Sequence, residues 1–411
     1  MAEPWVSLLV GGTLLLVGFA ASLVFERYRV PDFFMLLLLG MVLGQVPLSP
    51  FGPTAITNLE PILPVFTHLT LALILFEGGL ALNLSREGRR RPGPVTVHIL
   101  GAMALTMLLT WFIATRFLGL SEATGLVFAA AFSGPSAAIV LSFAPRLNLG
   151  TRALGAIVLE GVLGNVVAAV VVLFVIRFPG AAPPLELLIP YLGQVAVAAG
   201  IALVVGVAWR VGLSGLLAFK FQYIATLALA VIVYAVAEGI QGGNGAIAAF
   251  VVGLVISYGR SKASRLNEPM GDGLRAFQSE VTFVLRTFFF VYLGLTIRPE
   301  TFSVAALSGA LLLTAGFVLT RVPTSFYLGW AYRLSRRERR VVLATTGRGL
   351  TDIVLILFAI ESGVLPDAEE AFLVVLLPLI VLSAAVVCAG LVAWAERTQE
   401  APAAPPVPQA P

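Results

Sequence analysis

Long apolar segments constrain this chain more than any other feature of its sequence. Hydropathy predicts thirteen of them, and a helix needs roughly 20 apolar residues to cross the hydrocarbon core of a bilayer. We therefore predict an all-α polytopic membrane protein with 13 transmembrane helices. The predicted spans cover approximately residues 5–25, 33–48, 61–83, 95–118, 122–144, 151–177, 186–210, 219–239, 243–258, 279–298, 302–331, 340–361 and 371–395.

Composition excludes the main soluble classes. Apolar residues make up 59% of the chain and charged residues 12%, about half of the usual ~25% charged share of soluble domains. A single cysteine, Cys388, excludes a disulfide framework. With two histidines and no HExxH motif, a metalloprotease is not indicated. We expect no enzymatic activity, no cofactor and no nucleic-acid partner; membrane lipids surround the chain.

Basic residues indicate the orientation. Twenty of the 26 Lys and Arg residues fall in one alternating set of loops, whereas only Arg116, Arg177 and Arg298 fall in the opposite set. By the positive-inside rule, the N-terminus is predicted outside and the C-terminus in the cytoplasm. Residues 1–397 form the predicted transmembrane domain, and the Pro/Ala-rich residues 398–411 a disordered cytoplasmic tail.

The two halves of the chain resemble each other. Gly79-Leu80-Ala81-Leu82 matches Gly294-Leu295-Thr296-Ile297 at an offset of 215 residues. Gly40-Met41-Val42-Leu43 resembles Gly253-Leu254-Val255-Ile256 at an offset of 213. Spans 1–6 are therefore predicted to recur as spans 8–13, inverted by the odd seventh span. Inverted repeats are typical of secondary transporters.

Two spans in corresponding positions are interrupted. Span five contains Ser133-Gly134-Pro135-Ser136, and span twelve contains Gly347-Arg348-Gly349-Leu350-Thr351-Asp352. Proline removes a backbone donor and glycine permits unwinding. Paired interruptions indicate a substrate site near the midplane; the alternative is a pair of kinks that only serve packing.

Charged residues inside spans are costly and are functional candidates. Those in this chain are Glu77, Glu160, Arg286, Arg321, Arg348 and Asp352. We expect Glu160 to form an ion pair with Arg348, because buried charges are normally paired. Arg286 is a candidate counter-charge for Glu77 or Glu280. His68 and His98 fit a packing role as well as proton transfer.

Four motifs in their joint order resemble the monovalent cation/proton antiporter superfamily, the Na⁺/H⁺ and K⁺/H⁺ exchangers, and most closely its NhaP-type members. These are Leu75-Phe76-Glu77-Gly78-Gly79-Leu80, Ser133-Gly134-Pro135-Ser136, Glu160-Gly161-Val162-Leu163-Gly164-Asn165 and Arg348-Gly349. The resemblance implies the Na⁺/H⁺ antiporter fold, with crossed, discontinuous helices 5 and 12, in a homodimer.

The resemblance also implies a division of labour within each subunit. Residues 1–94 and 219–298 would form a dimerising scaffold, residues 95–177 and 302–397 a moving core, and residues 186–210 a linker helix. The core would carry the ion across the membrane by elevator-type movement past the scaffold.

The chain departs from the family at Asn165, where relatives that exchange cations usually have an Asp that holds the proton or the cation. Asparagine can lend an oxygen to an ion, but it cannot titrate. Asp352 lies four positions after Arg348. Relatives typically have a small or apolar residue at this position. Either the carrier carboxylate has moved to Asp352, or Asp352 only caps a half-helix, or proton exchange has been lost.

The sequence thus favours an antiporter of the prokaryotic plasma membrane that exchanges Na⁺ or K⁺ for H⁺. Asp352 is the preferred carrier and Glu160 the second candidate, with Arg348, Arg286 and Glu77 as counter-charges or structural charges. The neutral ion ligands would be Asn165, Ser133, Ser136 and Thr351, and the helix breaks Gly134, Pro135, Gly347 and Gly349. The alternatives are an uncoupled ion carrier or channel, and a non-transporting membrane sensor or scaffold.

Overall fold

The computed structural model describes residues 4–28, 32–45, 63–82, 92–136, 149–178, 185–215, 221–241, 244–258, 270–297 and 303–397. All regular elements in these ranges are helices. The predicted tail, residues 398–411, lies outside the described residues, as do the arginine-rich loops around positions 86–91 and 260–265.

Each predicted span contains helical structure in its described residues. The helices are α1 (Pro4–Tyr28), α2 (Asp32–Gln45), α4 (Leu63–Ala81), α5 (Pro92–Arg116), α6 (Glu122–Ala131), α8 (Thr151–Arg177), α9 (Leu185–Gly215), α10 (Gln222–Gln241), α11 (Gly245–Tyr258), α12 (Met270–Thr296), α13 (Val304–Tyr332), α14 (Arg336–Ala344), α15 (Leu350–Glu361) and α16 (Asp367–Arg397). Helices α14 and α15 together occupy the twelfth predicted span. The all-helical class is confirmed.

Helix α12 begins at Met270, well before the predicted start at residue 279. Its first turns are polar, so hydropathy misses them, but two of their polar side chains donate hydrogen bonds to α4. Arg275 donates to the carbonyl of Leu80 at 3.0 Å and Gln278 donates to the carbonyl of Leu73 at 3.1 Å. These bonds join the start of α12 to α4.

Within the described residues, seven helices are long and apolar enough to cross a membrane by length and composition. Apolar side chains such as Ile189, Val204 and Ile240 are exposed on the outer helices α9 and α10, as a surface against lipid requires. The number of crossings, thirteen, stays a prediction.

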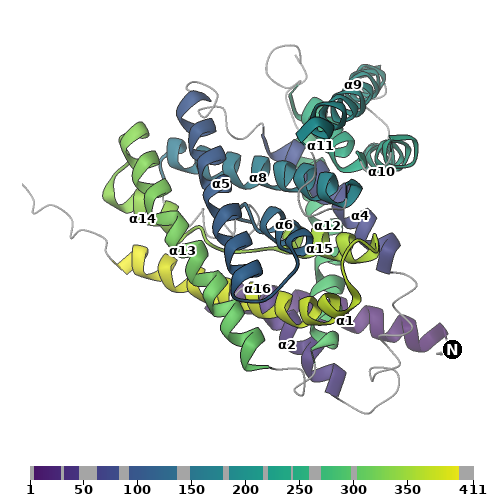
Figure 1. Cartoon of the computed structure of the whole chain (residues 1–411). Helices are drawn as coiled ribbons and strands as arrows, with labels where there is room; N and C mark the ends of the chain where they lie inside the picture. Colours follow the sequence, from purple (N-terminus) through teal and green to yellow (C-terminus); the bar gives the residue numbers. More distant parts are fainter. Residues whose placement is uncertain are drawn as a thin grey trace, which may run out of the picture.

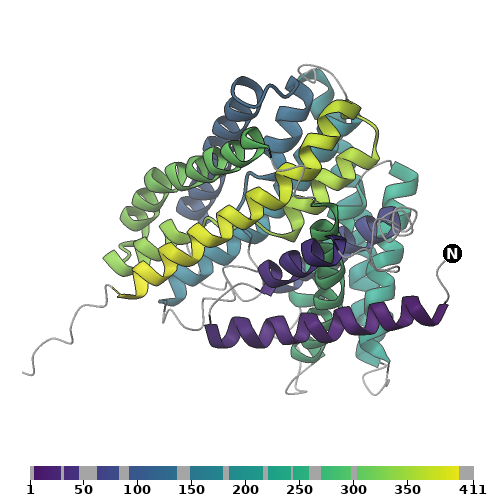
Figure 2. The same cartoon turned by 90° about the horizontal axis from the view of Figure 1, so that it is seen from below.

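Helices α6 and α15 lie near the middle of the molecule, with α5, α8, α13 and α16 around them (Figure 1). Helices α9 and α10 lie on the side away from α13 and α14. In the second view, α1 runs along one edge and α16 passes diagonally across the molecule (Figure 2). The two short helices α6 and α15 are thus enclosed by longer ones.

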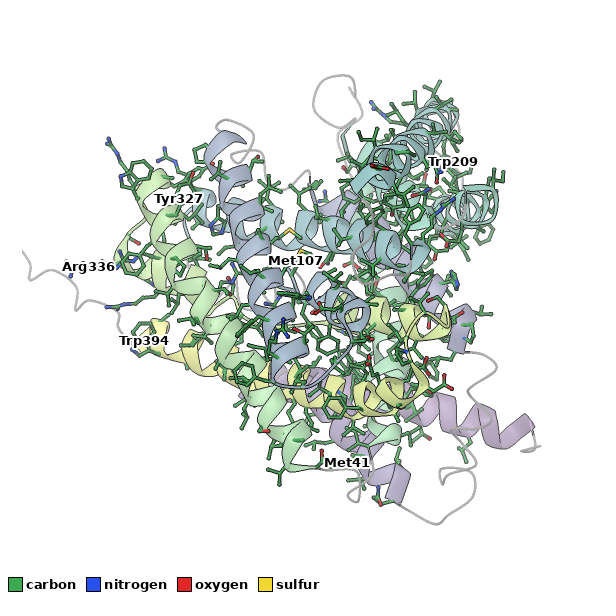
Figure 3. The ribbon with its side chains drawn as sticks, viewed as in Figure 1. Met41, Met107, Trp209, Tyr327, Arg336 and Trp394 are labelled. Carbon is green, nitrogen blue, oxygen red and sulfur yellow. The ribbon has the colours of Figure 1, made fainter. Side chains whose placement is uncertain are left out.

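Arginines and aromatic rings meet at the edge of the molecule formed by α13, α14 and α16. Figure 3 shows Tyr327, Arg336 and Trp394 there. The guanidinium of Arg339 lies 4.2 Å from the ring centroid of Phe326, and that of Arg340 lies 5.0 Å from the ring centroid of Trp394. Cationic and aromatic side chains together are typical of a membrane–water interface.

Two close helix pairs follow the predicted repeat. Helix α2 packs on α12 through Gly40 and Gly294, and α4 packs on α11 through Gly79 and Gly253. A Cβ on Gly294 would lie 2.8 Å from the Cα of Gly40, and one on Gly79 would lie 2.6 Å from the amide nitrogen of Leu254. Each pair joins one helix of the first repeat to one of the second.

A further contact joins residues separated by nearly the repeat offset. Thr106 of α5 donates to Thr320 of α13 at 3.1 Å, and the two residues are 214 positions apart. This offset falls between the two offsets found in the sequence, so the bond links nearly equivalent positions of the repeats. The predicted duplication therefore has a counterpart in three separate contacts.

We expect Gly79→Ala to lower stability by about 1–3 kcal/mol, the usual cost of overpacking a close contact, because the added methyl would meet rigid backbone. Gly200→Ala in α9 is the matched control, since nothing lies within 4 Å of its Cβ position. Thermal unfolding in detergent should show a lower midpoint for Gly79→Ala only. Equal midpoints would contradict the close approach.

Candidate ion-binding site

Both predicted interruptions are present. Helix α6 ends at Ala131, and residues 133–136 are not helical. Helix α14 ends at Ala344, and residues 345–349 form an extended segment before α15 begins at Leu350. The continuation of span five over residues 137–144 lies outside the described residues. Each interruption leaves backbone groups without a helical partner, which must find one inside the protein.

The two interruptions supply each other's partners. The backbone N–H of Ser136 donates to the carbonyl of Gly347 at 2.9 Å. The guanidinium of Arg348 donates in turn to the carbonyl of Gly134. A Cβ on Gly349 would collide with the side chain of Ser136. The two breaks therefore touch each other directly, and a side chain at position 349 would have to displace that of Ser136.

Arg348 is held by aromatic rings as well as by this carbonyl. It is fully buried, and its guanidinium lies 3.9 Å from the ring centroid of Phe317 in α13. Phe317 in turn stacks on Phe132 at the end of α6, with centroids 5.9 Å apart. A cation over an aromatic face is favourable, most of all away from water. Arg348 thus fastens the second break to both α6 and α13.

Asp352 lies buried in the first turn of α15. Its Oδ2 accepts a hydrogen bond from the backbone N–H of Gly349 at 2.8 Å. A carboxylate here satisfies a free donor and faces the positive end of the helix dipole. Arg348 also interacts with it electrostatically. Asp352 therefore caps the half-helix, and this bond engages one of its two carboxylate oxygens.

The predicted neutral ligands lie on α8, on α15 and in the first break. The Asn165 side-chain amide, from α8, donates to Thr351 Oγ1 at 3.2 Å, so the structure brings these two residues together. Ser136 lies against Gly349. Ser133 Oγ is buried and has no hydrogen-bond partner among the described residues. A buried hydroxyl without a partner is uncommon and needs an explanation.

The predicted ion pair between Glu160 and Arg348 is wrong. Glu160 Oε1 contacts the guanidinium of Arg321 at 2.5 Å, and its Oε2 contacts His98 Nε2 at 3.2 Å. Arg348 instead reaches the carbonyl of Gly134 and the ring of Phe317. The break itself needs this guanidinium, and α13 offers Glu160 a second arginine. Both oxygens of Glu160 are thereby engaged.

Sequence reasoning did not predict that His98 and Arg321 contact Glu160. They come from α5 and α13, and both are buried. The sequence identifies Arg321 as a charge inside a predicted span but assigns it no partner. That unassigned charge was the signal that could have pointed to Glu160. Nothing in the local sequence around His98 indicates its contact with Glu160.

The remaining predicted charged residues, Glu77 of α4 and Arg286 of α12, link these two helices. Glu77 Oε2 accepts from Thr282 Oγ1 at 2.8 Å. Arg286 interacts electrostatically with Glu77, which agrees with one of its two predicted partners.

Two inverted repeats that bring a pair of interrupted helices together define a multi-pass membrane protein with the architecture of a secondary transporter. The chain belongs to the sodium/hydrogen exchanger family, whose transmembrane region matches residues 12–394. No curated protein matches the chain.

Solved structures support the fold. The structure of the sodium proton antiporter MjNhaP1 from Methanocaldococcus jannaschii at pH 8 is similar with a TM-score of 0.74 and 19% identity, over 96% of this chain and 98% of that chain. An electron-microscopy structure of the same antiporter is similar with a TM-score of 0.69 and 21% identity, over 97% and 100%.

A double-mutant cycle should locate the partner of Glu160. Removing one member of a buried ion pair costs about 3–5 kcal/mol because the other charge is stranded. We expect Glu160→Gln and Arg321→Gln each to lower stability on this scale, and the double variant to lose clearly less than their sum. Arg348→Gln, combined with Glu160→Gln, is the matched control and should show weaker coupling, because the interaction of Arg348 with Glu160 is electrostatic only. Stronger coupling of Glu160 to Arg348 than to Arg321, measured by thermal unfolding, would contradict the pairing.

Proposed function

We propose that this chain is a secondary active antiporter that exchanges Na⁺ or K⁺ for H⁺ across the plasma membrane of a prokaryote. Membership of the sodium/hydrogen exchanger family supports antiport of a cation against protons. The observation that carries the proposal is the position of Asp352, a buried carboxylate beside the contact between two interrupted helices.

Asp352 is the proposed carrier. A buried carboxylate is unfavourable as a bare charge, so a proton or a cation must compensate it. The two compete for the same oxygens, and this competition is what couples their movements. The bond from Gly349 engages Oδ2, so the exchange would use Oδ1.

Neutral oxygens would complete the coordination of the cation. Asn165, Thr351, Ser133 and Ser136 supply side-chain oxygens from three separate elements. Hard cations prefer such ligands, and the unpartnered hydroxyl of Ser133 would gain an ion to bind. Glu160 is assigned a structural role instead, because Arg321 and His98 engage both of its oxygens.

Alternating access would come from movement of one part of the subunit past another. In this proposal residues 95–177 and 302–397 form the core, residues 1–94 and 219–298 a scaffold that also dimerises, and residues 186–210 the linker. His68 of α4 and Glu361 of α15 lie 3.7 Å apart across this boundary. An ion pair at this distance contributes little and can separate at little cost. The arginine distribution supports an outside N-terminus.

Asp352→Asn should abolish proton flux driven by a cation gradient while the protein stays folded. Asparagine keeps the size and the cap-forming oxygen of aspartate but cannot hold an exchangeable proton. Purified protein in liposomes with a pH-sensitive dye, tested with Na⁺ and K⁺ salts, measures this flux. Full activity of Asp352→Asn would rule out this carrier.

Asn165→Asp in the Asp352→Asn background is the matched gain-of-function variant. It rebuilds a carboxylate next to Thr351, so exchange should return. The second candidate function is uncoupled ion movement, and one observation favours it for an anion: Arg348 places a fixed positive charge at the contact of the two breaks, where its guanidinium donates to the carbonyl of Gly134. In that case the parent protein would conduct charge without moving protons.

A further inference from the structure

Both ring nitrogens of His98 face oxygen atoms. Nδ1 lies 3.1 Å from the backbone carbonyl of Thr324 in α13, and Nε2 lies 3.2 Å from Oε2 of Glu160 in α8. A carbonyl oxygen can only accept a hydrogen bond, and so can an ionised carboxylate. A neutral imidazole has one N–H and would direct a lone pair at one of these oxygens. Two good contacts therefore require a hydrogen on each nitrogen.

Glu160 is held in its ionised form by its second partner. Arg321 contacts Oε1, and a guanidinium has only donors and does not lose its proton in proteins. A protonated Glu160 could donate to a neutral His98, but it would leave this buried guanidinium without a compensating charge, which is costly. The hydrogen between Glu160 and His98 therefore belongs to the histidine.

No other charged group competes for His98 in the described structure. Helix α5 packs against α6, α8 and α13. Helix α8 contributes Glu160 and α13 contributes Arg321 together with the carbonyl of Thr324. The acidic residue of α6, Glu122, bonds Trp111 near the other end of α5.

We propose that His98 is a proton-binding site of this protein, separate from Asp352, and that these two oxygen acceptors hold it as an imidazolium. The bound proton joins three helices, because His98 comes from α5, Glu160 from α8, and Arg321 and Thr324 from α13. Loss of this proton would direct a nitrogen lone pair of His98 at an oxygen atom, and the side chains of His98 and Glu160 are buried away from water.

The proton also sets the charge of the interior. Arg321, Glu160 and His98 together carry one net positive charge, and Arg348 interacts electrostatically with both Arg321 and Glu160. Arg348 also interacts electrostatically with Asp352, the proposed carrier. A positive cluster beside it disfavours an additional cation by like-charge repulsion, so His98 would influence how tightly a cation binds.

His68 provides an internal comparison. Its Nδ1 lies 2.8 Å from the hydroxyl of Tyr234, and a hydroxyl can either donate or accept. Its Nε2 lies 3.7 Å from Glu361, beyond normal hydrogen-bond distance. A neutral His68 ring with one N–H can therefore make the hydrogen bond to Tyr234 without a second hydrogen. The chain has only these two histidines, so each can be observed alone after the other is replaced.

Solid-state NMR of ¹⁵N-histidine-labelled full-length protein in lipid bilayers tests the proposal at pH 8. In His68→Gln, the remaining ring should show one-bond N–H coupling on both nitrogens. In His98→Gln, the remaining ring should show one bare nitrogen. A bare nitrogen in His68→Gln at pH 8 would overturn the proposal. The readout does not depend on transport, so it stands or fails separately from the proposed antiport.

A third variant tests the cause. Adding Glu160→Gln to His68→Gln replaces the acceptor by an amide that can also donate, so His98 should lose one N–H at pH 8. Where stranding Arg321 prevents folding, Glu160→Gln with Arg321→Gln removes both charges and makes the same prediction. Two N–H signals in the folded variant would show that Glu160 does not hold the proton, contrary to the proposal.

Discussion

A helix that is interrupted inside a membrane leaves backbone groups that lipid cannot hydrogen-bond, and this constraint organises the centre of the protein. The two interruptions solve it for each other. Ser136 donates to Gly347, Arg348 donates to Gly134, and Asp352 accepts from Gly349. Segments more than 200 residues apart must therefore be assembled together. The surrounding helices, and the burial of Phe317 beneath Arg348, follow from the need to enclose this contact.

Much of the fold could be predicted because its signals are local. Apolar length marks each span, and proline with glycine marks the break at Pro135. The break at Gly349 became credible through its equivalent position in the repeat. The same repeat, read from two glycine-containing matches, corresponds in space to the contacts Gly40–Gly294 and Gly79–Gly253. The start of α12 at Met270 escaped prediction because its polar face bonds α4 instead of facing water.

The partner of Glu160 could not be predicted because it depends on how α13 is rotated about its axis. Three arginines lie within the predicted spans, and Arg348 was preferred because it belongs to the second break. The structure uses Arg348 for the backbone of the first break, which leaves Glu160 to Arg321. His98 gave still less warning, since a lone histidine in an apolar span has no periodic or motif-based signal. Side-chain partners of this kind are decided by packing between distant segments.

The glycine pairs of the two repeats have a consequence for the history of the chain. After a duplication, two copies can usually drift apart independently. Here Gly40 touches Gly294 and Gly79 touches Gly253, so a residue in one copy is the steric boundary of a residue in the other. A larger side chain on either partner must be accommodated by the opposite copy. Divergence between the halves is therefore restricted pairwise at these contacts, while exposed positions such as Gly101 in α5, with nothing within 4 Å of its Cβ position, are free of that restriction.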